Sequence, residues 1–367
     1  MKIKQKIIIF VFNFSLLFIN IYLFNVYIKK IIFIKSSDEY IFFNKNYTYF
    51  INNIDLLFNN SISKEKKISL ICKDTLDDDG CSLGIKKILE KKLNSIVDIR
   101  EENPDYLIYD VFGCKHMSEK YKNSVKIAKY SENIIPDFSE ADYAISQAHI
   151  IYLDRYFKYP SFIWRLKKFN NTNVVNIFNF IKNVKKYKFC AAVISNHGNN
   201  SLFRLDFIKQ LNNYKHVDMG GKFSNDIGRY VKNKIEFLKA YKFSISMENS
   251  NGDGYISEKI IDSFLAGTIP IYYGDYLIDE YINPKVYILI KGEKDIHKKI
   301  DYIKKIDKND SLYNSIIKEP IFINDKYTDI MKKIEDERSK FFYNIFLQGK
   351  NNSKRIDDVN INYNCLM

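Results

Sequence analysis

One segment of the chain, residues 243–275, constrains its fold most strongly. It reads FSISMENSNGDGYISEKIIDSFLAGTIPIYYGD. Its pattern predicts a strand, a polar loop, a helix and a second strand, at residues 243–247, 248–257, 258–265 and 268–273. Ser257 is placed to cap the helix, and Gly267 is placed to end it. A helix that starts just after a strand exposes unpaired amides and a positive dipole end, so this junction, with Lys259 in its first turn, predicts a phosphate site in an α/β protein.

Three blocks of sequence are more specific than this pattern. The segment above contains FxxxxEN, GYISEK and GTIPIYYGD, while SENIIPDFSEADYAIS occupies residues 131–146 and CAAVISNHGNNSLFR occupies residues 190–204. Residues 243–275 resemble the donor-binding signature of the family 10 glycosyltransferases, the α-1,3-fucosyltransferases that use GDP-fucose. Residues 131–146 are similar to the acceptor-side block of that family, and residues 190–204 are similar to its segment ending in a phosphate-binding arginine. The blocks follow the family's order, and the resemblance spans roughly residues 66–320.

Strand-like and helix-like segments alternate along the body of the chain. Strands are predicted at residues 67–72, 106–109, 124–130, 142–146, 189–194 and 216–218, and helices at 84–93 and 203–211. A linker at about residues 166–187 separates two such runs. The pattern predicts an α/β protein with two Rossmann-like domains facing a cleft, where ligands bind at the carboxyl ends of the strands. The resemblance implies the same GT-B-type glycosyltransferase fold, with the acceptor in the first half and the donor in the second.

Five regions are therefore expected. They are an N-terminal membrane anchor (1–30), a stem (31–65), an acceptor-side Rossmann-like domain with its linker (66–187), a GDP-fucose-binding Rossmann-like domain (188–320), and C-terminal helices with a tail (321–367). The charged helices over 326–347 are expected to pack back across the two halves. The terminal DDVNINY resembles one copy of a heptad that some bacterial family members repeat. Because only one copy is present, we expect a solvated tail.

The amino terminus contains an uncharged run, residues 7–28, long enough to cross a bilayer as a helix. Three asparagines in the run raise the cost of insertion. A membrane anchor is predicted, and a cleaved signal peptide or an amphipathic or buried helix are the alternatives. Lysines flank the run on both sides, so its orientation stays open. The expected location is a membrane, with the catalytic body on the cytoplasmic face in a bacterium or in a Golgi-type lumen in a eukaryote.

Composition excludes some classes of function. There are 57 Lys and Arg against 44 Asp and Glu, a formal net charge of +13, but the charge is dispersed and no nucleic-acid-binding motif accompanies it. A basic balance fits an anionic membrane surface or a phosphate-bearing donor. The five cysteines are widely spaced without a CxxC motif, so we expect buried thiols in place of a disulfide framework or a structural metal site.

Sugar transfer from a nucleotide diphosphate to an alcohol needs a base for the attacking hydroxyl and positive charge beside the leaving phosphates. Glu132 follows the predicted strand that ends at Tyr130, where the carboxyl end of a sheet opens. The resemblance makes Glu132 the general base. On local sequence alone, it could instead cap the turn before Pro136. Asp137 and Asp142 are weaker alternatives for the base.

Cationic residues at helix starts are the candidates for phosphate binding. Arg204 begins a predicted helix after a polar loop, so its guanidinium could grip a pyrophosphate in a bidentate manner, although an ordinary surface arginine is the alternative. Lys259 would act as a point charge beside the cap at Ser257. The resemblance implies that the donor site also includes Asn249, Tyr255 and Glu258, whereas Glu248 is expected to orient the loop. Weaker donor-binding candidates are Asn196, Tyr230 and Lys234.

A metal site is not predicted. Asp77, Asp78 and Asp79 have the DxD spacing of a different glycosyltransferase fold, which holds its nucleotide through manganese, but they precede every matched block. A solvated turn is therefore expected there. The five histidines have no ligand spacing. We expect no required cofactor, although a divalent metal could stimulate the reaction.

The sequence thus predicts an inverting fucosyltransferase that moves L-fucose from GDP-fucose to an N-acetylglucosamine or glucose hydroxyl of a glycan in α-1,3 linkage. Its expected partners are GDP-fucose, an oligosaccharide or glycoconjugate acceptor, and a membrane through residues 7–28, with no nucleic acid. Two alternatives remain. One is a transferase of the same fold that uses another nucleotide sugar, and the other is a catalytically silent glycan-binding module.

Overall fold

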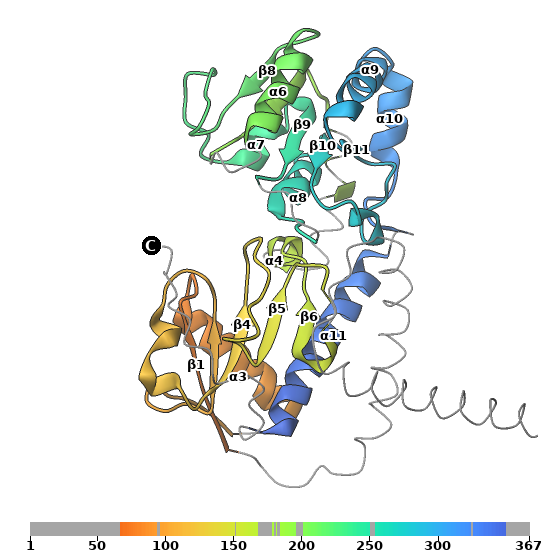
Figure 1. Ribbon diagram of the computed structural model, residues 1–367. Coiled ribbons are helices and arrows are strands. Elements are labelled where there is room, and N and C mark those ends of the chain that lie inside the picture. Colours follow the sequence, from red (N-terminus) through yellow and green to blue (C-terminus); the bar gives the residue numbers. More distant parts are fainter. Residues whose placement is uncertain are drawn as a thin grey trace, which may run out of the picture.

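The computed structural model describes residues 67–93, 96–150, 152–167, 178–179, 181, 184–195, 201–249, 254–323 and 326–349. These residues form two halves, each built around a parallel sheet, which lie one above the other (Figure 1). The predicted anchor, stem and C-terminal tail lie outside the described residues. No helix of the described part is long and apolar enough to cross a membrane.

The first half contains a six-stranded sheet. In chain order its elements are β1 (Lys67–Lys73), α3 (Asp78–Leu93), β2 (Ile96–Ile99), β3 (Tyr106–Tyr109), β4 (Val125–Lys129), β5 (Tyr143–Ser146), β6 (Tyr156–Lys158) and α4 (Phe162–Lys167). The strands lie in the order β2-β1-β3-β4-β5-β6, and every pairing is parallel. All residues of β3 and β5 are buried, as expected for central strands of a parallel sheet covered on both faces.

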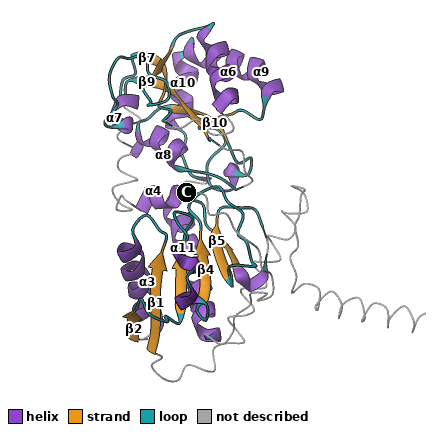
Figure 2. Cartoon of the chain, turned by 60° about the vertical axis from the view of Figure 1, so that its left-hand side comes forward, coloured by secondary structure: helices purple, strands orange, loops and turns teal. Residues whose placement is uncertain are grey.

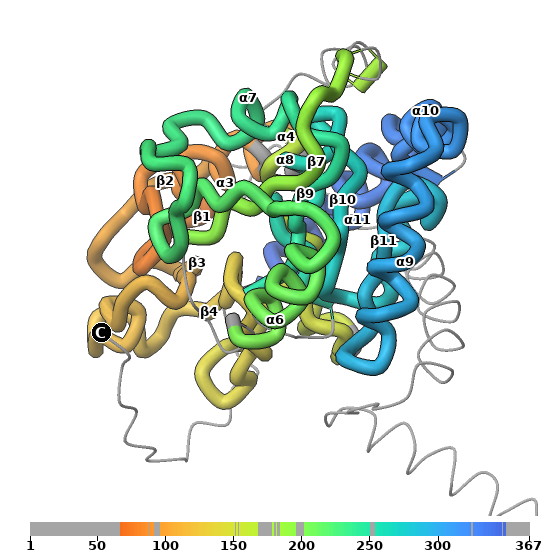
Figure 3. Tube along the Cα trace, turned by 90° about the horizontal axis from the view of Figure 1, so that it is seen from above, coloured from red at the N-terminus to blue at the C-terminus, as the bar shows by residue number. Residues whose placement is uncertain are grey.

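The second half contains a five-stranded sheet in the order β11-β10-β9-β7-β8, also parallel throughout. Its elements are β7 (Lys188–Ala192), α6 (Ser201–Asn212), β8 (Val217–Met219), α7 (Lys234–Leu238), β9 (Tyr241–Met247), α8 (Glu258–Leu265), β10 (Ile269–Tyr273), β11 (Ile288–Leu289), α9 (Ile296–Asp307) and α10 (Asp310–Lys318). Seen from above, α9 and α10 lie on the β11 side of this sheet (Figure 3). Short 3₁₀ turns complete the described part, at Lys115–Met117, Glu119–Tyr121, Leu153–Arg155, Ile278–Glu280 and Glu293–Asp295.

The last helix, α11 (Tyr327–Gln348), returns from the second half and runs along the first (Figure 1). The ring of Phe346 lies 4.3 Å from that of Tyr106 on β3, and the ring of Phe341 lies 5.7 Å from that of Phe157 on β6. Tyr159 donates a hydrogen bond of 2.8 Å to Glu335. The carboxyl-terminal helix therefore completes the core of the first half.

The two halves meet where the carboxyl ends of their strands face each other. Figure 2 shows α4 and α8 lying between the two sheets. Phe162 at the start of α4 donates its N–H to the carbonyl of Ile256, and Arg165 forms a 2.7 Å ion pair with Asp262 of α8. The α8 helix begins at the predicted Ser257 cap and ends before Gly267, whose φ of 68° suits glycine.

The α/β class and the parallel sheets match the prediction. One local expectation is wrong, and another is confirmed only in part. Cys72 and Cys81 form a disulfide, because the turn between β1 and α3 brings their Cα atoms to 6.0 Å, within the range that a disulfide spans. Only Cys190, of these three, is a buried thiol. The DxD acids are solvent-accessible as expected, but only Asp77 precedes the helix, because Asp78 and Asp79 lie in the first turn of α3.

Candidate functional site

The predicted base lies at the carboxyl end of β4, in the middle of the first sheet. The carboxylate of Glu132 is exposed, but the residue before it is held firmly. Ser131 donates its hydroxyl to Asp110 at 2.9 Å and its N–H at 3.4 Å, and its carbonyl accepts a 3.0 Å bond from Gln147. Asp110 and Gln147 follow β3 and β5, the two neighbours of β4. Three adjacent strand ends thus fix the backbone of Glu132 and leave its carboxylate open.

The surroundings of Glu132 raise its pKa. Partial desolvation contributes most, and the negative charges of Asp110, Glu258 and Glu248 act in the same direction against the positive charge of Lys259. A raised pKa improves a carboxylate as a proton acceptor near neutral pH. The second half contributes Glu258, Glu248 and Lys259. The predicted base therefore lies close enough to these residues for their charges to shift its pKa.

A buried carboxylate organises the start of α8. Glu248 has no exposed side-chain surface, and it accepts hydrogen bonds from the N–H of Ser257 at 2.8 Å and from its hydroxyl at 2.7 Å. It also pairs with the ammonium of Lys259 at 2.7 Å. Glu248 therefore orients the loop and anchors the helix cap, while the charge that it carries is balanced by Lys259.

Two of the three N–H groups of the Lys259 ammonium are engaged. One donates to Glu248, and another donates to the hydroxyl of Ser257 at 3.0 Å. Glu258 lies 3.9 Å away, beyond hydrogen-bond distance. Among the described residues the third N–H has no acceptor. Burial alone would lower the pKa of Lys259, but the carboxylates of Glu248 and Glu258 raise it, so the group stays charged and can donate to a phosphate.

The predicted phosphate-binding arginine lies in the first turn of α6. Arg204 is 3% exposed, and its guanidinium reaches the carbonyl of Met247 at the end of β9 at 3.5 Å. Burial lowers its pKa, and the charge of Glu248 opposes this change. The charge of Arg204 also acts on Lys259. The two cations therefore share one neighbourhood around Glu248, although they are more than 50 residues apart in sequence.

The other donor candidates surround this cluster. Tyr255 is buried, and its ring centroid lies 6.0 Å from the ammonium of Lys259. Burial and the charges of Glu248 and Glu132 raise the pKa of Tyr255, so its hydroxyl stays protonated. Asn249 has a buried side-chain oxygen with no hydrogen-bond partner in the described part of the chain. Such an oxygen is costly unless a ligand satisfies it.

Glu258 stands at the first position of α8 with 52% of its side chain exposed. Desolvation would raise its pKa, but the positive charges of Lys259 and Lys234 and the hydrogen bonds of the helix start lower it. The carboxylate is therefore ionised and faces outward. It can accept hydrogen bonds from hydroxyl groups of a ligand bound at this helix start.

The weaker candidates have different surroundings. Lys234 pairs with the buried carboxylate of Asp262 at 3.2 Å, so its charge is partly used within the fold. Tyr230 is 65% exposed on a loop. Asn196 lies outside the described residues. Asp137 accepts two hydrogen bonds from Ser139, and Asp142 is fully buried and accepts from the N–H of Lys126, so both alternatives to Glu132 are engaged locally.

No group of three or more metal-ligating side chains occurs in the described part of the chain. In the DxD stretch, Asp78 accepts two hydrogen bonds from Thr75, and Asp77 accepts one from the N–H of Gly80. These acids stabilise the start of α3. His116 and His149 each face one aspartate, namely Asp74 and Asp275. The residues present therefore offer no composite cation site within the described ranges.

Sequence reasoning missed Asp110 and Gln147. Asp110 directly follows a predicted strand, and a polar residue at that position is a signal that could have been used. Gln147 also follows a predicted strand, but its role depends on partners 16, 14 and 109 residues away, which no local pattern reveals.

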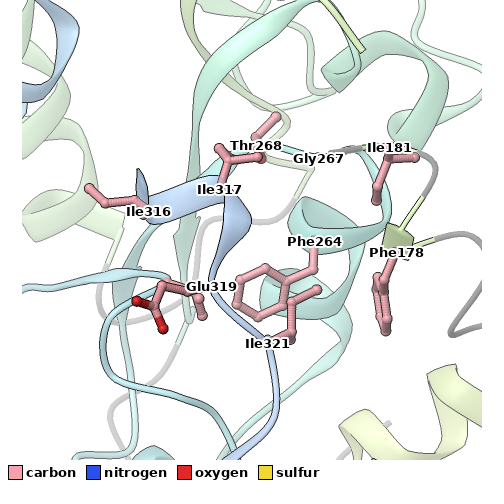
Figure 4. A pocket seen from close by; sticks show the side chains of 10 residues that line it. Phe178, Ile181, Phe264, Gly267, Thr268, Ile316, Ile317, Glu319 and Ile321 are labelled. Atoms are coloured by element: carbon pink, nitrogen blue, oxygen red, sulfur yellow. The ribbon is translucent and has the colours of Figure 1, made fainter. Parts of the chain in front are cut away.

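A separate hollow lies at the other end of α8. It is lined by Phe178, Ile181, Phe264, Gly267, Thr268, Val286, Ile316, Ile317, Glu319 and Ile321 (Figure 4). Thr268 immediately precedes β10, so this hollow lies at the amino end of that strand. Ligands of open parallel sheets bind at the carboxyl ends. The hollow is therefore distinct from the cluster around Lys259.

Sequence comparisons agree with this division into halves. Residues 73–165 match the family model described as the alpha-(1,3)-fucosyltransferase FucT N-terminal domain, and residues 183–318 match glycosyltransferase family 10 (fucosyltransferase) C-term. The chain is 31% identical to alpha-(1,3)-fucosyltransferase FucT of Helicobacter pylori over 252 residues, which cover 59% of this chain and 52% of that protein. It is 34% identical to human 4-galactosyl-N-acetylglucosaminide 3-alpha-L-fucosyltransferase 9 over 97 residues, 25% of this chain and 27% of that protein. The chain thus spans about half the length, or less, of these curated relatives.

Solved structures of fucosyltransferases are also similar to this chain. A crystal structure of an alpha1,3-fucosyltransferase is similar with a TM-score of 0.61 and 25% identity, covering 77% of this chain and 90% of that one. The crystal structure of alpha1,3-fucosyltransferase with GDP-fucose is similar with a TM-score of 0.58 and 26% identity, covering 78% of this chain and 93% of that one. The likeness extends across both halves.

Proposed function

The chain belongs to glycosyltransferase family 10, and from this premise we propose that it transfers L-fucose from GDP-fucose to a hydroxyl of an N-acetylglucosamine or glucose unit of a glycan, in α-1,3 linkage. One observation supports the proposal most directly. An open carboxylate from the first half, Glu132, interacts electrostatically with the cation of Lys259 at the start of α8. A base and a phosphate-binding group are the two parts that such a transfer needs.

The proposed reaction is a single displacement. The carboxylate of Glu132 takes the proton of the acceptor hydroxyl, whose oxygen forms a bond to C1 of fucose. The bond between C1 and the phosphate oxygen breaks, and its electron pair leaves with GDP. Because attack and departure occur on opposite sides of C1, the configuration at C1 inverts and no protein nucleophile is needed.

The cations of the second half stabilise the leaving group in this scheme. The unengaged N–H of Lys259 donates to a phosphate oxygen, and Arg204 adds positive charge beside it. Glu258, Asn249 and Tyr255 hold the rest of the donor, with the buried oxygen of Asn249 accepting a hydrogen bond from it. We propose that no cofactor is required. Addition of a chelator tests this point, since a complete loss of activity that manganese restores would contradict it.

The central test is the substitution Glu132→Gln. We expect GDP release from GDP-fucose in the presence of a lactosamine acceptor to fall about 10²- to 10⁴-fold, because the amide cannot accept the proton. The affinity for GDP, measured by calorimetry, should stay close to that of the wild type. Asp137→Asn, on the same loop, is the matched control and should keep its activity. Near-normal turnover by Glu132→Gln would contradict the assignment of the base.

The same assay separates the alternatives. A panel of nucleotide sugars distinguishes fucose from other donors, and the absence of GDP release with every acceptor would favour a glycan-binding module. Membrane attachment through residues 7–28 stays a prediction. It is tested by comparing the membrane fraction of cells expressing the full chain with that of cells expressing residues 31–367, since equal distribution would contradict an anchor.

A further inference from the structure

One buried side chain joins three segments around the site. Gln147, at the carboxyl end of β5, is 1% exposed. Its amide NH₂ group donates to the carbonyl of Ser131 at 3.0 Å. Its carbonyl oxygen accepts from the N–H of Ser161 at 3.1 Å and from the N–H of Ile256 at 3.2 Å. These partners immediately precede Glu132, α4 and the cap of α8.

The orientation of this amide is dictated by its partners. Backbone N–H groups can only donate and a backbone carbonyl can only accept, so the oxygen of Gln147 must face Ser161 and Ile256 while the nitrogen faces Ser131. An uncharged primary amide satisfies all three groups at once, whereas an ionised carboxylate of the same length has no proton to donate to Ser131. Because Ile256 belongs to the second half, the side chain also bridges the two halves.

The backbone of the loop before α8 also lies close to the backbone of Gln147. Gly254 has a φ of 99°, and a Cβ atom placed there would lie 1.9 Å from the carbonyl oxygen of Gln147. The loop before α8 therefore rests directly on the end of β5, and both features require glycine. The hydrogen bond that Ile256 donates to Gln147 lies two residues after Gly254 in the same loop.

We propose that Gln147 is a positioning residue that holds the Glu132 loop and the donor-binding loop at a fixed distance and orientation. The inference rests on the proposed function, in which Glu132 and the α8 start act on the same substrate pair. One bond of the amide fixes the backbone of the base, and another fixes the backbone beside Tyr255 and Ser257. Neither loop can move without breaking a hydrogen bond of the buried Gln147 side chain, which is costly. Reacting groups displaced by about 1 Å lose about 10²-fold in rate.

Two substitutions separate the two sides of this bridge. In Gln147→Glu, the carboxylate still accepts from Ser161 and Ile256 but repels the carbonyl of Ser131 until it is protonated. In Gln147→Met, all three bonds are lost at similar volume. Gln348→Met is the matched control, because Gln348 bridges Tyr143 and Asp154 within the first half, away from the base.

For Gln147→Glu we expect kcat at neutral pH to fall about 10- to 100-fold while the KM for GDP-fucose stays within about twofold. The ratio of its kcat to that of the wild type should rise at acid pH, where the new carboxyl group can donate to Ser131. For Gln147→Met, kcat should fall and the KM for GDP-fucose should rise together. The proposal would be overturned if both variants lowered thermal stability but kept the kcat of the wild type, and if the ratio of the kcat of Gln147→Glu to that of the wild type did not change with pH.

A second readout does not depend on turnover. Gln147→Met should accelerate amide hydrogen exchange in both loops, at residues 131–135 and 254–259, and weaken GDP binding, whereas Gln147→Glu should affect residues 131–135 alone. Exchange that changes in neither loop, or equally in both variants, would refute the bridge. If the wild type binds GDP but transfers no fucose, the proposed function fails, while the exchange measurement still decides the role of Gln147.

Discussion

At the scale of single residues, Asp110 is the charged group that, after partial desolvation of Glu132, contributes most to the raised pKa of the base. Its carboxylate is buried, it holds Ser131, and its charge raises the pKa of Glu132. Asp110→Asn removes this charge and keeps one acceptor for Ser131. We expect the pKa of Glu132 to fall, so the acid limb of the kcat/KM profile should move to lower pH, since that limb reports the free base.

The pH dependence of fucose transfer by Asp110→Asn measures this effect. Glu140→Gln serves as the control, because Glu140 lies at the far end of the same loop, and its acid limb should coincide with that of the wild type. An acid limb that stays in place or moves to higher pH in Asp110→Asn would contradict the electrostatic role of Asp110.

The residues of the site divide into those that a sequence reader can find and those that only the fold reveals. Glu132, Arg204 and Lys259 follow strands or begin helices, and the quoted blocks carry them, so their neighbourhood could be predicted. Asp110 and Gln147 act through hydrogen bonds to segments distant in the chain. Such partners depend on strand order, and the order β3-β4-β5 that brings Asp110, Glu132 and Gln147 side by side is not encoded in local periodicity.

At the scale of elements, α11 also has packing partners that local sequence does not reveal. Its helical period predicts its extent to within about one residue, but its partner, the first sheet, becomes visible only in the structure. Three short edge strands were also missed by the prediction. β2, β6 and β11, which have four, three and two residues and lie at edges of their sheets, were not predicted, whereas the similarly short β3, β5 and β8 were. Longer strands with buried centres, such as β9, were predicted close to their observed bounds.

The role of α11 can be tested by Phe346→Ala. Phe346 is 2% exposed and packs on Tyr106 of β3, so its loss leaves a cavity at the centre of the first half. We expect the free energy of unfolding, measured in urea, to fall by about 3 to 5 kcal/mol. Leu83→Ala, at a position that is 51% exposed on α3, is the control and should change it by less than about 0.5 kcal/mol. A loss for Phe346→Ala no larger than that of the control would mean that α11 does not complete this core.

At the scale of the whole molecule, the arrangement of the two halves depends on a few polar links across their junction. His149 from the first half pairs with both carboxylate oxygens of Asp275 from the second, at 2.9 and 3.0 Å, and both side chains are almost completely buried. Lys158 and Glu280 form a second link at 3.3 Å nearer the surface. The junction therefore contains two polar pairs, one of them almost completely buried, and the loss of either should destabilise both halves.

We expect Asp275→Ala to lower the free energy of unfolding by about 3 kcal/mol near neutral pH, because it removes the buried carboxylate that pairs with His149 across the junction. Burial alone would raise the pKa of Asp275, but the bond to His149 and nearby positive charges lower it below its ordinary value of 3.8. A carboxylate with a lowered pKa contributes stability that is complete above the unfolded value and is lost as pH falls through the folded one. The difference between the free energies of unfolding of the wild type and Asp275→Ala should therefore shrink as the pH falls below 3.8. Urea unfolding at pH values on both sides of 3.8, with the exposed Asp279→Ala as control, measures this difference, and a difference that does not shrink below 3.8 would show that the carboxylate of Asp275 does not stabilise the junction.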